Sequence, residues 1–284
     1  MYQQYRKVIV VHQFTFAPWN LSWDALGKAS IDRTKILGSH CPHTQFFKNS
    51  YTARIATSRR VIEVMLGAII GFNTMAIEAM QRGRHIESKN LLLQALHGLR
   101  SMQAMQENNG GCVGLLFGRL SISSVAISMT PMRTANSDIF FIFDRALAIA
   151  HDSQIGDASD CCIPKIATAV LYNMGLTLQL FAAETGTTSY LKKAADFYMN
   201  AMAAARIAAL NNEDVLIVLA LVNNMGCVFL KLVDYQGASN CLTMLSDFYE
   251  AADASSILND EDATFFFFTC FVFPKWQIIA APMA

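Results

Sequence analysis

Apolar side chains recur at intervals of three and four residues along several long stretches of the chain. This spacing places them on one face of an α-helix. Three such sets are Ser88, Leu92, Ala95 and Leu96; Ala194, Tyr198, Ala201 and Met202; and Ala238, Leu242 and Leu245. The pattern predicts helices at about residues 61–82, 84–107, 163–184, 189–210, 213–232 and 235–253. Each helix carries an apolar stripe that another element must cover.

Signals at the helix ends agree with this assignment. Ser159-Asp160 before Pro164 fits a helix start with an early proline, and Asn211–Asp214 supplies caps and negative charge for the next start. Asn108–Gly111 fits a helix stop. The helices therefore occur in pairs joined by short turns.

Residues 112–158 do not follow the helical pattern. Leu120–Met129 and Ile139–Ile149 are rich in β-branched or aromatic residues and are separated by a polar loop that contains Pro131. This composition is typical of strands. The region is predicted to be a short extended insert between helix pairs.

An aromatic C-terminal segment, residues 264–284, has a second region of β character. Its first part, Thr264–Phe273, has strong β-propensity and no charge, and would be prone to aggregate if exposed. We expect it to be buried, either paired with Ile139–Phe143 or packed over the last helix.

An internal repeat relates three of these stretches. Residues 222–238 read VNNMGCVFLKLVDYQGA, Leu171–Gly175 reads LYNMG, and a weaker copy begins at Phe72. Each copy has a small residue at the centre of its first helix, Ala76, Gly175 or Gly226. A small side chain there allows a neighbouring helix to approach closely.

These residues resemble the tetratricopeptide repeat, with Gly226, Phe229, Asp234, Tyr235 and Ala238 in register with its pattern. The resemblance covers repeats at about 61–107, 163–210 and 213–253. The copy at 171 departs by an insertion at Phe181–Ser189, and the copy at 72 departs at several positions. The resemblance implies a mainly α fold, an α-α superhelix of helical hairpins that stack on one another. It also implies a scaffold or adaptor that binds a protein or peptide and needs no cofactor.

Polar residues on the inner face of the first helix of each pair are the candidate peptide-binding residues. Asparagine has poor helix propensity, and its amide both donates and accepts, which suits the backbone of an extended peptide. The amides could equally bond between neighbouring helices. The candidates are Asn73, Tyr172, Asn173, Gln179, Asn223, Asn224 and Lys231.

Charge is distributed unevenly although the formal net charge is zero. Residues 1–60 hold nine Lys or Arg against Asp24 and Asp32. We expect this basic segment to be poorly ordered and to precede one repeat domain at residues 61–284. Organelle targeting, a nucleic-acid arm and a tail that docks on the acidic remainder are alternatives.

Hydropathy and cysteine usage indicate the compartment. No run reaches about 18 uninterrupted apolar residues, so no membrane span is expected. The seven cysteines show no CxxC spacing, which is typical of reduced thiols. Cys227 and Cys241 fall on apolar helical faces. These features predict a soluble, cytoplasmic protein.

Candidate chemistry is sparse. His40-Cys41-Pro42-His43 lacks a second ligand pair for zinc, residues 109–114 lack a phosphate-loop pattern, and Cys161-Cys162 has no neighbouring base. We therefore predict no catalytic, cofactor or metal residues and no enzyme. The competing hypothesis is an enzyme or enzyme subunit with a site in residues 112–158. RNA binding through residues 1–60 is a third, disfavoured hypothesis.

Overall fold

The computed structural model describes residues 44–108, 120–127, 142–151, 162–208, 214–253, 258 and 260–272. This part of the chain is mainly helical, with seven α-helices and one two-stranded sheet. The helices are α1 (Thr44–Gln81), α2 (His85–Asn108), α3 (Cys162–Thr185), α4 (Thr188–Ile207), α5 (Val215–Lys231), α6 (Tyr235–Asp253) and α7 (Asp260–Phe267). The strands are β1 (Leu120–Ala126) and β2 (Arg145–His151).

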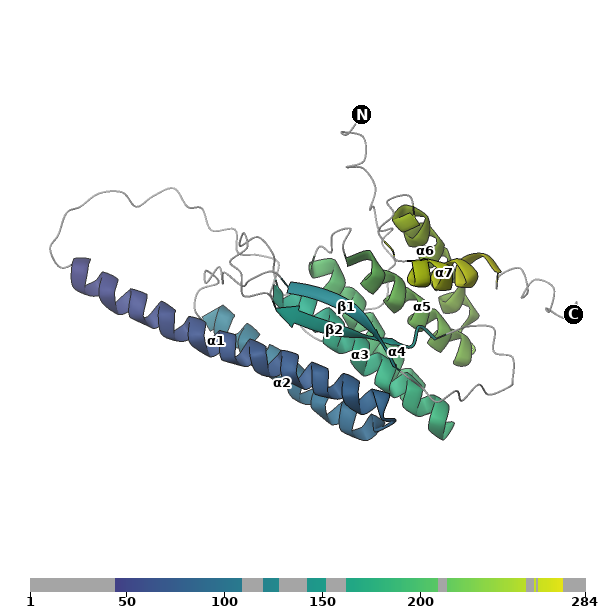
Figure 1. Ribbon diagram of the computed structural model, residues 1–284, viewed down its shortest axis with the longest axis horizontal. Coiled ribbons are helices and arrows are strands. Elements are labelled where there is room, and N and C mark those ends of the chain that lie inside the picture. Colours follow the sequence, from purple (N-terminus) through teal and green to yellow (C-terminus); the bar gives the residue numbers. More distant parts are fainter. Residues whose placement is uncertain are drawn as a thin grey trace, which may run out of the picture. The chain divides into compact units, whose positions relative to one another are not determined.

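The first six helices form three consecutive pairs (Figure 1), and five of the six lie within three residues of their predicted bounds. Packing continues from pair to pair, since α2 contacts α3 and α4 contacts α5. The apolar stripes are therefore covered both within and between pairs. Their side chains form one hydrophobic core that also includes the two strands.

The turns within the pairs depend on left-handed backbone positions. Gly83 has φ +69° between α1 and α2, and Gly186 has φ +67° between α3 and α4. The third turn places Val233 at φ +63°, an unusual conformation for a β-branched residue. Asp234 then caps α6, because its Oδ1 accepts a 2.9 Å hydrogen bond from the Gly237 N–H.

The small residue predicted at the centre of α3 lies at a close helix contact. A Cβ atom on Gly175 would lie 2.6 Å from Cε1 of Tyr198 in α4. Tyr198 is fully buried, so its ring packs directly on the α3 backbone. The requirement for glycine thus comes from this ring.

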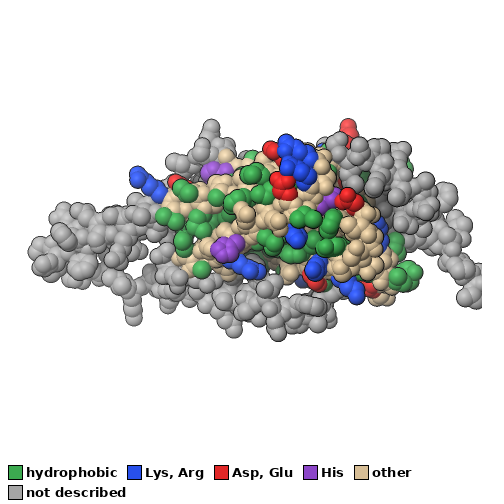
Figure 2. Space-filling view, turned by 90° about the horizontal axis from the view of Figure 1, so that it is seen from below, with side chains coloured by type: hydrophobic (Ala, Val, Ile, Leu, Met, Phe, Trp, Pro, Cys, Tyr) green, Lys and Arg blue, Asp and Glu red, His purple; other side chains and the backbone are tan. Residues whose placement is uncertain are grey.

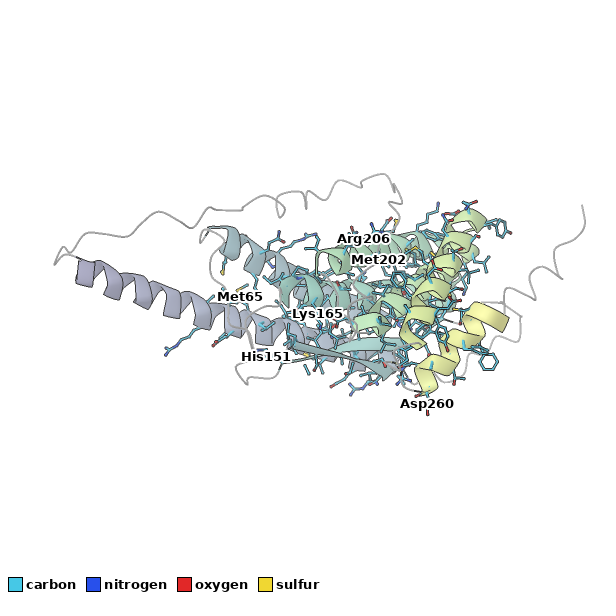
Figure 3. The ribbon with its side chains drawn as sticks, turned by 90° about the horizontal axis from the view of Figure 1, so that it is seen from above. Met65, His151, Lys165, Met202, Arg206 and Asp260 are labelled. Atoms are coloured by element: carbon cyan, nitrogen blue, oxygen red, sulfur yellow. The ribbon has the colours of Figure 1, made fainter. Side chains whose placement is uncertain are left out.

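A buried ion pair joins the second and third helix pairs. Lys165 Nζ in α3 lies 2.6 Å from Oδ1 of Asp214, the residue before α5. Their side chains are 13% and 7% exposed, and Lys165 lies among the packed helices (Figure 3). Loss of either partner would leave an uncompensated buried charge.

The two strands form an antiparallel hairpin pair that lies against the helices (Figure 1). Leu120 is opposite His151 and Ala126 is opposite Arg145. The strands predicted within residues 120–129 and 139–149 are therefore present. β2 packs on α3, and its Ala146, Leu147 and Ile149 are buried.

The prediction of β structure in the C-terminal segment is wrong. α7 is followed by a π-helical turn at Phe268–Val272, and neither pairs with a strand. Acidic residues in the first turn of α7 favour a helix start, and Phe265 and Phe266 pack on Phe143 as helix neighbours. Tertiary packing and charge thus override local β-propensity. Phe266 is buried as expected, but Phe267 and Phe268 are 47% and 48% exposed.

The predicted start of the first helix at residue 61 also needs correction, because α1 begins at Thr44. Residues 44–66 contain neither proline nor glycine, so nothing in them stops a helix. Residues 1–43, including the His40–His43 cluster, lie outside the described residues, as do the glycine-rich residues 109–114.

Among the described residues, two helical stretches are long and apolar enough to cross a membrane, Arg60–Gln81 and Ile163–Thr185. Neither stretch is an uninterrupted apolar run, and core helices of soluble proteins have the same length and composition, so the two stretches are weak evidence for a membrane span. The window in α3 is 89% buried, as in a core helix, whereas that in α1 is 33% buried. On the face seen in Figure 2, hydrophobic side chains lie interspersed with charged ones.

The Gly175 contact generates a stability prediction. Gly175→Ala should lower the free energy of unfolding by about 1–3 kcal/mol, because the new methyl group overlaps a ring that has no room to move. Gly71→Ala is the control, since a Cβ there meets nothing within 4 Å. It should stabilise α1 by about 0.5–1 kcal/mol. Urea unfolding measures both, and equal effects would contradict the packing described.

Candidate functional site

Among the described residues, the strand register leaves one edge of the extended segment, residues 142–151, without a β partner. Ile127 N–H donates to Asp144 O at 3.0 Å, so the pair 127/144 is hydrogen-bonded. Bonded and non-bonded pairs alternate along an antiparallel ladder. Even-numbered residues from Asp144 to Ala150 thus direct their N–H and C=O groups toward β1. Odd-numbered residues from Phe143 to Ile149 direct theirs away from it, where buried backbone groups need other partners.

Asn173 of α3 supplies the partner at Leu147. Its Oδ1 accepts the Leu147 N–H at 2.8 Å, and its Nδ2 donates to Leu147 O at 2.8 Å. One side-chain amide therefore bonds both backbone groups of one residue, as a neighbouring strand would. Asn73 of α1 also donates to Leu147 O, at 3.0 Å.

Asn224 of α5 makes the same double contact at Phe143. Its Oδ1 accepts the Phe143 N–H at 2.8 Å, and its Nδ2 donates to Phe143 O at 3.0 Å. Asn224 is fully buried, and Asn223 Nδ2 donates to its Oδ1 at 3.0 Å. Asn223 therefore acts on the segment through Asn224.

Tyr172 covers the backbone between these two contacts. Its hydroxyl lies 3.0 Å from Arg145 O and 3.2 Å from Phe143 O, and it accepts from Asn224 Nδ2 at 3.0 Å. Complete burial raises the pKa of Tyr172 well above its usual value, so the hydroxyl keeps the proton that it donates. We call Asn173, Asn224 and Tyr172 the backbone clamp.

Further buried polar groups fix the clamp in place. Asn173 Nδ2 donates to Asn73 Oδ1 at 2.8 Å, which links α3 to α1. Ser88 Oγ of α2 lies 3.1 Å from Thr177 Oγ1 of α3. These bonds tie the first two helix pairs together at the level where they contact the strand.

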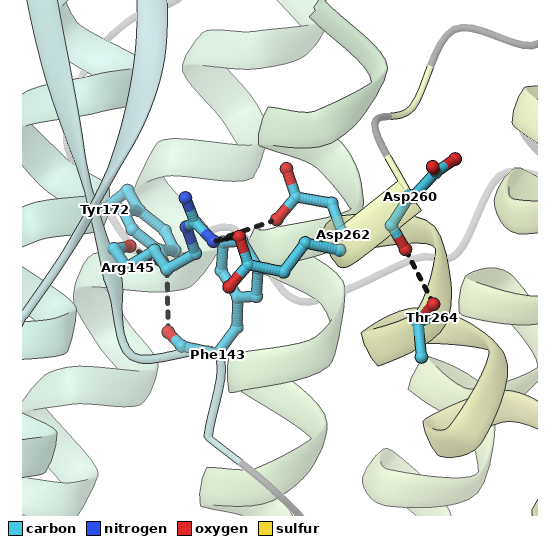
Figure 4. Close-up of polar contacts among 7 residues, drawn as sticks. Phe143, Arg145, Tyr172, Asp260, Asp262 and Thr264 are labelled. Carbon is cyan, nitrogen blue, oxygen red and sulfur yellow. Dashed lines mark hydrogen bonds and ion pairs between the residues drawn. The ribbon is translucent and has the colours of Figure 1, made fainter.

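Side chains of the extended segment contact α7 (Figure 4). The Phe143 ring centroid lies 5.1 Å from that of Phe265 and 5.0 Å from that of Phe266. Arg145 Nη1 lies 2.9 Å from Glu261 Oε2 and 3.7 Å from Asp262 Oδ1. The acidic start of α7 therefore lies against a basic residue of the segment.

The structure brings together five of the seven candidate residues at the extended segment. Asn73, Tyr172, Asn173 and Asn224 contact the extended segment directly, and Asn223 contacts Asn224. Gln179 is also buried, and its Oε1 accepts a 2.7 Å hydrogen bond from the Tyr198 hydroxyl. Lys231 is exposed at the last residue of α5, about two helical turns after Asn224, and within the described chain no contact joins it to the segment.

The two alternative uses of the asparagine amides both occur. Asn73 and Asn173 bond between helices, while Asn173 and Asn224 bond the backbone of an extended strand. Sequence reasoning missed that this strand belongs to the same chain. It also missed Arg145, Glu261 and Asp262, and it expected Phe143 only as part of a possible strand partner for the C-terminal segment.

The described residues contain no group of three or more His, Cys, Asp or Glu side chains that could hold a metal ion. Burial raises the pKa of the Cys227 and Cys241 thiols to about 12 and that of Cys270 to about 11. These thiols are therefore neutral near pH 7 and poor nucleophiles.

Comparisons of the chain with protein-family models, with curated proteins and with solved structures gave no match.

The clamp predicts two local effects on amide hydrogen exchange. Asn173→Ala should speed exchange at Leu147, and Asn224→Ala should speed it at Phe143, each by about tenfold or more, because a buried N–H loses its acceptor. Asn90→Ala, at an exposed position of α2, should change neither. If each variant affected both amides equally, the clamps would not act as separate contacts.

The cysteine environment predicts low reactivity. At pH 8, Cys227, Cys241 and Cys270 should remain unmodified by iodoacetamide in the native chain and react fully in urea, because burial blocks access and keeps the thiols protonated. Peptide mass mapping identifies the modified positions. Rapid native labelling of Cys227 would contradict its burial.

Proposed function

We propose that this chain is a scaffold or adaptor that binds a protein or peptide, with an α-α superhelical, tetratricopeptide-like arrangement of its helix pairs. The observation that carries the proposal is the backbone clamp. Asn173 and Asn224 lie in α3 and α5, the first helices of consecutive pairs, and each grips one residue of an extended segment.

Three features support a binding role for this arrangement. The clamp bonds only N–H and C=O groups, so it accepts an extended backbone of any sequence that fits the surrounding side chains. It is repeated from one helix pair to the next, as the internal sequence repeat implies. Its amides are also held in position by neighbouring helix residues, since Asn73 accepts from Asn173 and Asn223 donates to Asn224.

The extended segment of the chain itself fills the clamp in this structure. A covalently attached segment has a high effective concentration, so it competes strongly with any partner peptide. Partner binding therefore requires the segment to be weakened or displaced. The competing idea, an enzyme with a site in residues 112–158, gains no support from the described part of that region, which forms the hairpin.

The test supplies the segment in trans. A fluorescein-labelled peptide with the sequence of residues 142–151 is titrated into full-length chains whose own segment is weakened by Arg145→Gln or, separately, Phe143→Leu. Fluorescence anisotropy should show saturable binding to these chains and at least about tenfold weaker binding to the unmodified chain. Circular dichroism first establishes which variants fold. Two host chains are used so that the test remains possible if one of them does not fold.

N-methylation of the peptide identifies the clamp as the binding site. Methylation at the position of Leu147 removes the N–H that Asn173 accepts and should weaken binding by about 5- to 100-fold. Methylation at the position of His151, where the strand ends and is exposed, is the matched control. Absence of binding, or equal binding of both methylated peptides, would refute the proposed function.

A further inference from the structure

The extended segment occupies side-chain sites as well as the clamp. Odd-numbered residues point to one face of the strand, and three of them lie in distinct surroundings: Phe143, Arg145 and Leu147. The clamp bonds only backbone groups and does not depend on the type of side chain, whereas the surroundings of these three side chains do. The three sites therefore define which peptides would fit.

The Phe143 site is aromatic. Phe143 is 1% exposed and lies between Phe265 in an edge-to-face contact and Phe266 in a stacked contact. Aromatic pairs in these geometries contribute beyond the area that they bury. An aliphatic side chain would fill the space without these contacts, so the site favours an aromatic residue.

The Arg145 site requires a positive charge. Asp262 is 1% exposed, and its Oδ1 lies 3.7 Å from Arg145 Nη1, while Glu261 Oε2 lies at 2.9 Å. A buried carboxylate needs a nearby cation. An incoming peptide with a basic residue at this position would form the same ion pairs with Glu261 and Asp262 that Arg145 forms.

The Leu147 site is a closed apolar space. Leu147 is 0% exposed, and it lies four positions after Phe143, at the second point of the clamp. A polar residue there would be buried without a partner. The three sites together thus favour an aromatic, a basic and an aliphatic residue at alternate positions of the peptide.

Two features of the surroundings suit exchange of the occupant. Of the seven residues of β1 only Leu120 is buried, whereas Ser121, Ser123 and Ala126 are exposed, so few buried side chains hold this strand in place. α7 leaves Phe267 and Phe268 half exposed and continues as a π-helical turn, a rare form often found at functional sites.

We propose that the partner is a peptide segment with an aromatic residue, a basic residue two positions later and a leucine-like residue two positions after that. It displaces the chain's own segment, and Glu261 and Asp262 of α7 select its basic residue. This inference rests on the proposed function and specifies its ligand.

The experiment exchanges charge between peptide and α7. The Arg145→Gln chain is the host, and the probes are the labelled 142–151 peptide and the same peptide with Arg145→Glu. The unmodified peptide should bind about a hundredfold more tightly, because the glutamate would face a buried carboxylate. Adding Glu261→Lys to the host should shrink this preference at least about fivefold. Asp247→Lys, the same charge change at an exposed site on α6, should leave it intact.

The outcomes separate the two proposals. If neither peptide binds to either the Arg145→Gln or the Phe143→Leu host, the proposed function fails. If both peptides bind with equal affinity, the function stands and the proposed selectivity is wrong. If a preference exists but Glu261→Lys and Asp247→Lys change it equally, general electrostatics explain it and the assignment to α7 is overturned.

Discussion

In the described part of the chain, β2 has a neighbouring strand, β1, on one side only, so one row of its backbone N–H and C=O groups needs other partners. The structure depends on how this row is hydrogen-bonded. Buried without partners, each such group would destabilise the fold by about 1–3 kcal/mol. Asn173 and Asn224 resolve the problem because a carboxamide carries a donor and an acceptor side by side. The same amides would themselves be buried and unsatisfied without the strand. The helices and the strand thus satisfy each other's hydrogen-bonding groups.

The helices and the polar candidates could be predicted from the sequence because both leave local signals. Helical spacing of apolar residues and Gly or Asn-rich boundaries place α2 to α6 closely. The NMG copies identify Gly175 as a point of close approach, which the Tyr198 ring confirms. Asparagines in otherwise apolar helices are unfavourable locally, so their presence indicates a use in tertiary contacts.

The remaining features depend on contacts between distant residues. Nothing near Leu147 indicates that its backbone pairs with Asn173, since the two meet only after the helices pack. The run Phe265–Phe268 has β-propensity in isolation, yet it is helical because Phe143 and Arg145 lie across from it. Lys231 follows the helical repeat, but it is exposed at the last residue of α5, about two turns after the segment's contact at Asn224.

The clamp relates the spacing of the helix pairs to the distance between two residues of the strand. Phe143 and Leu147 are about 13 Å apart along an extended strand, since each residue rises about 3.3 Å. Asn173 and Asn224 must keep a matching separation, which the stacking of α3 and α5 sets. A rotation of one pair relative to the other would change that separation and strain the hydrogen bonds at Leu147 and at Phe143 together. Deformation of the helix stack and binding of an extended segment at the backbone clamp are consequently linked.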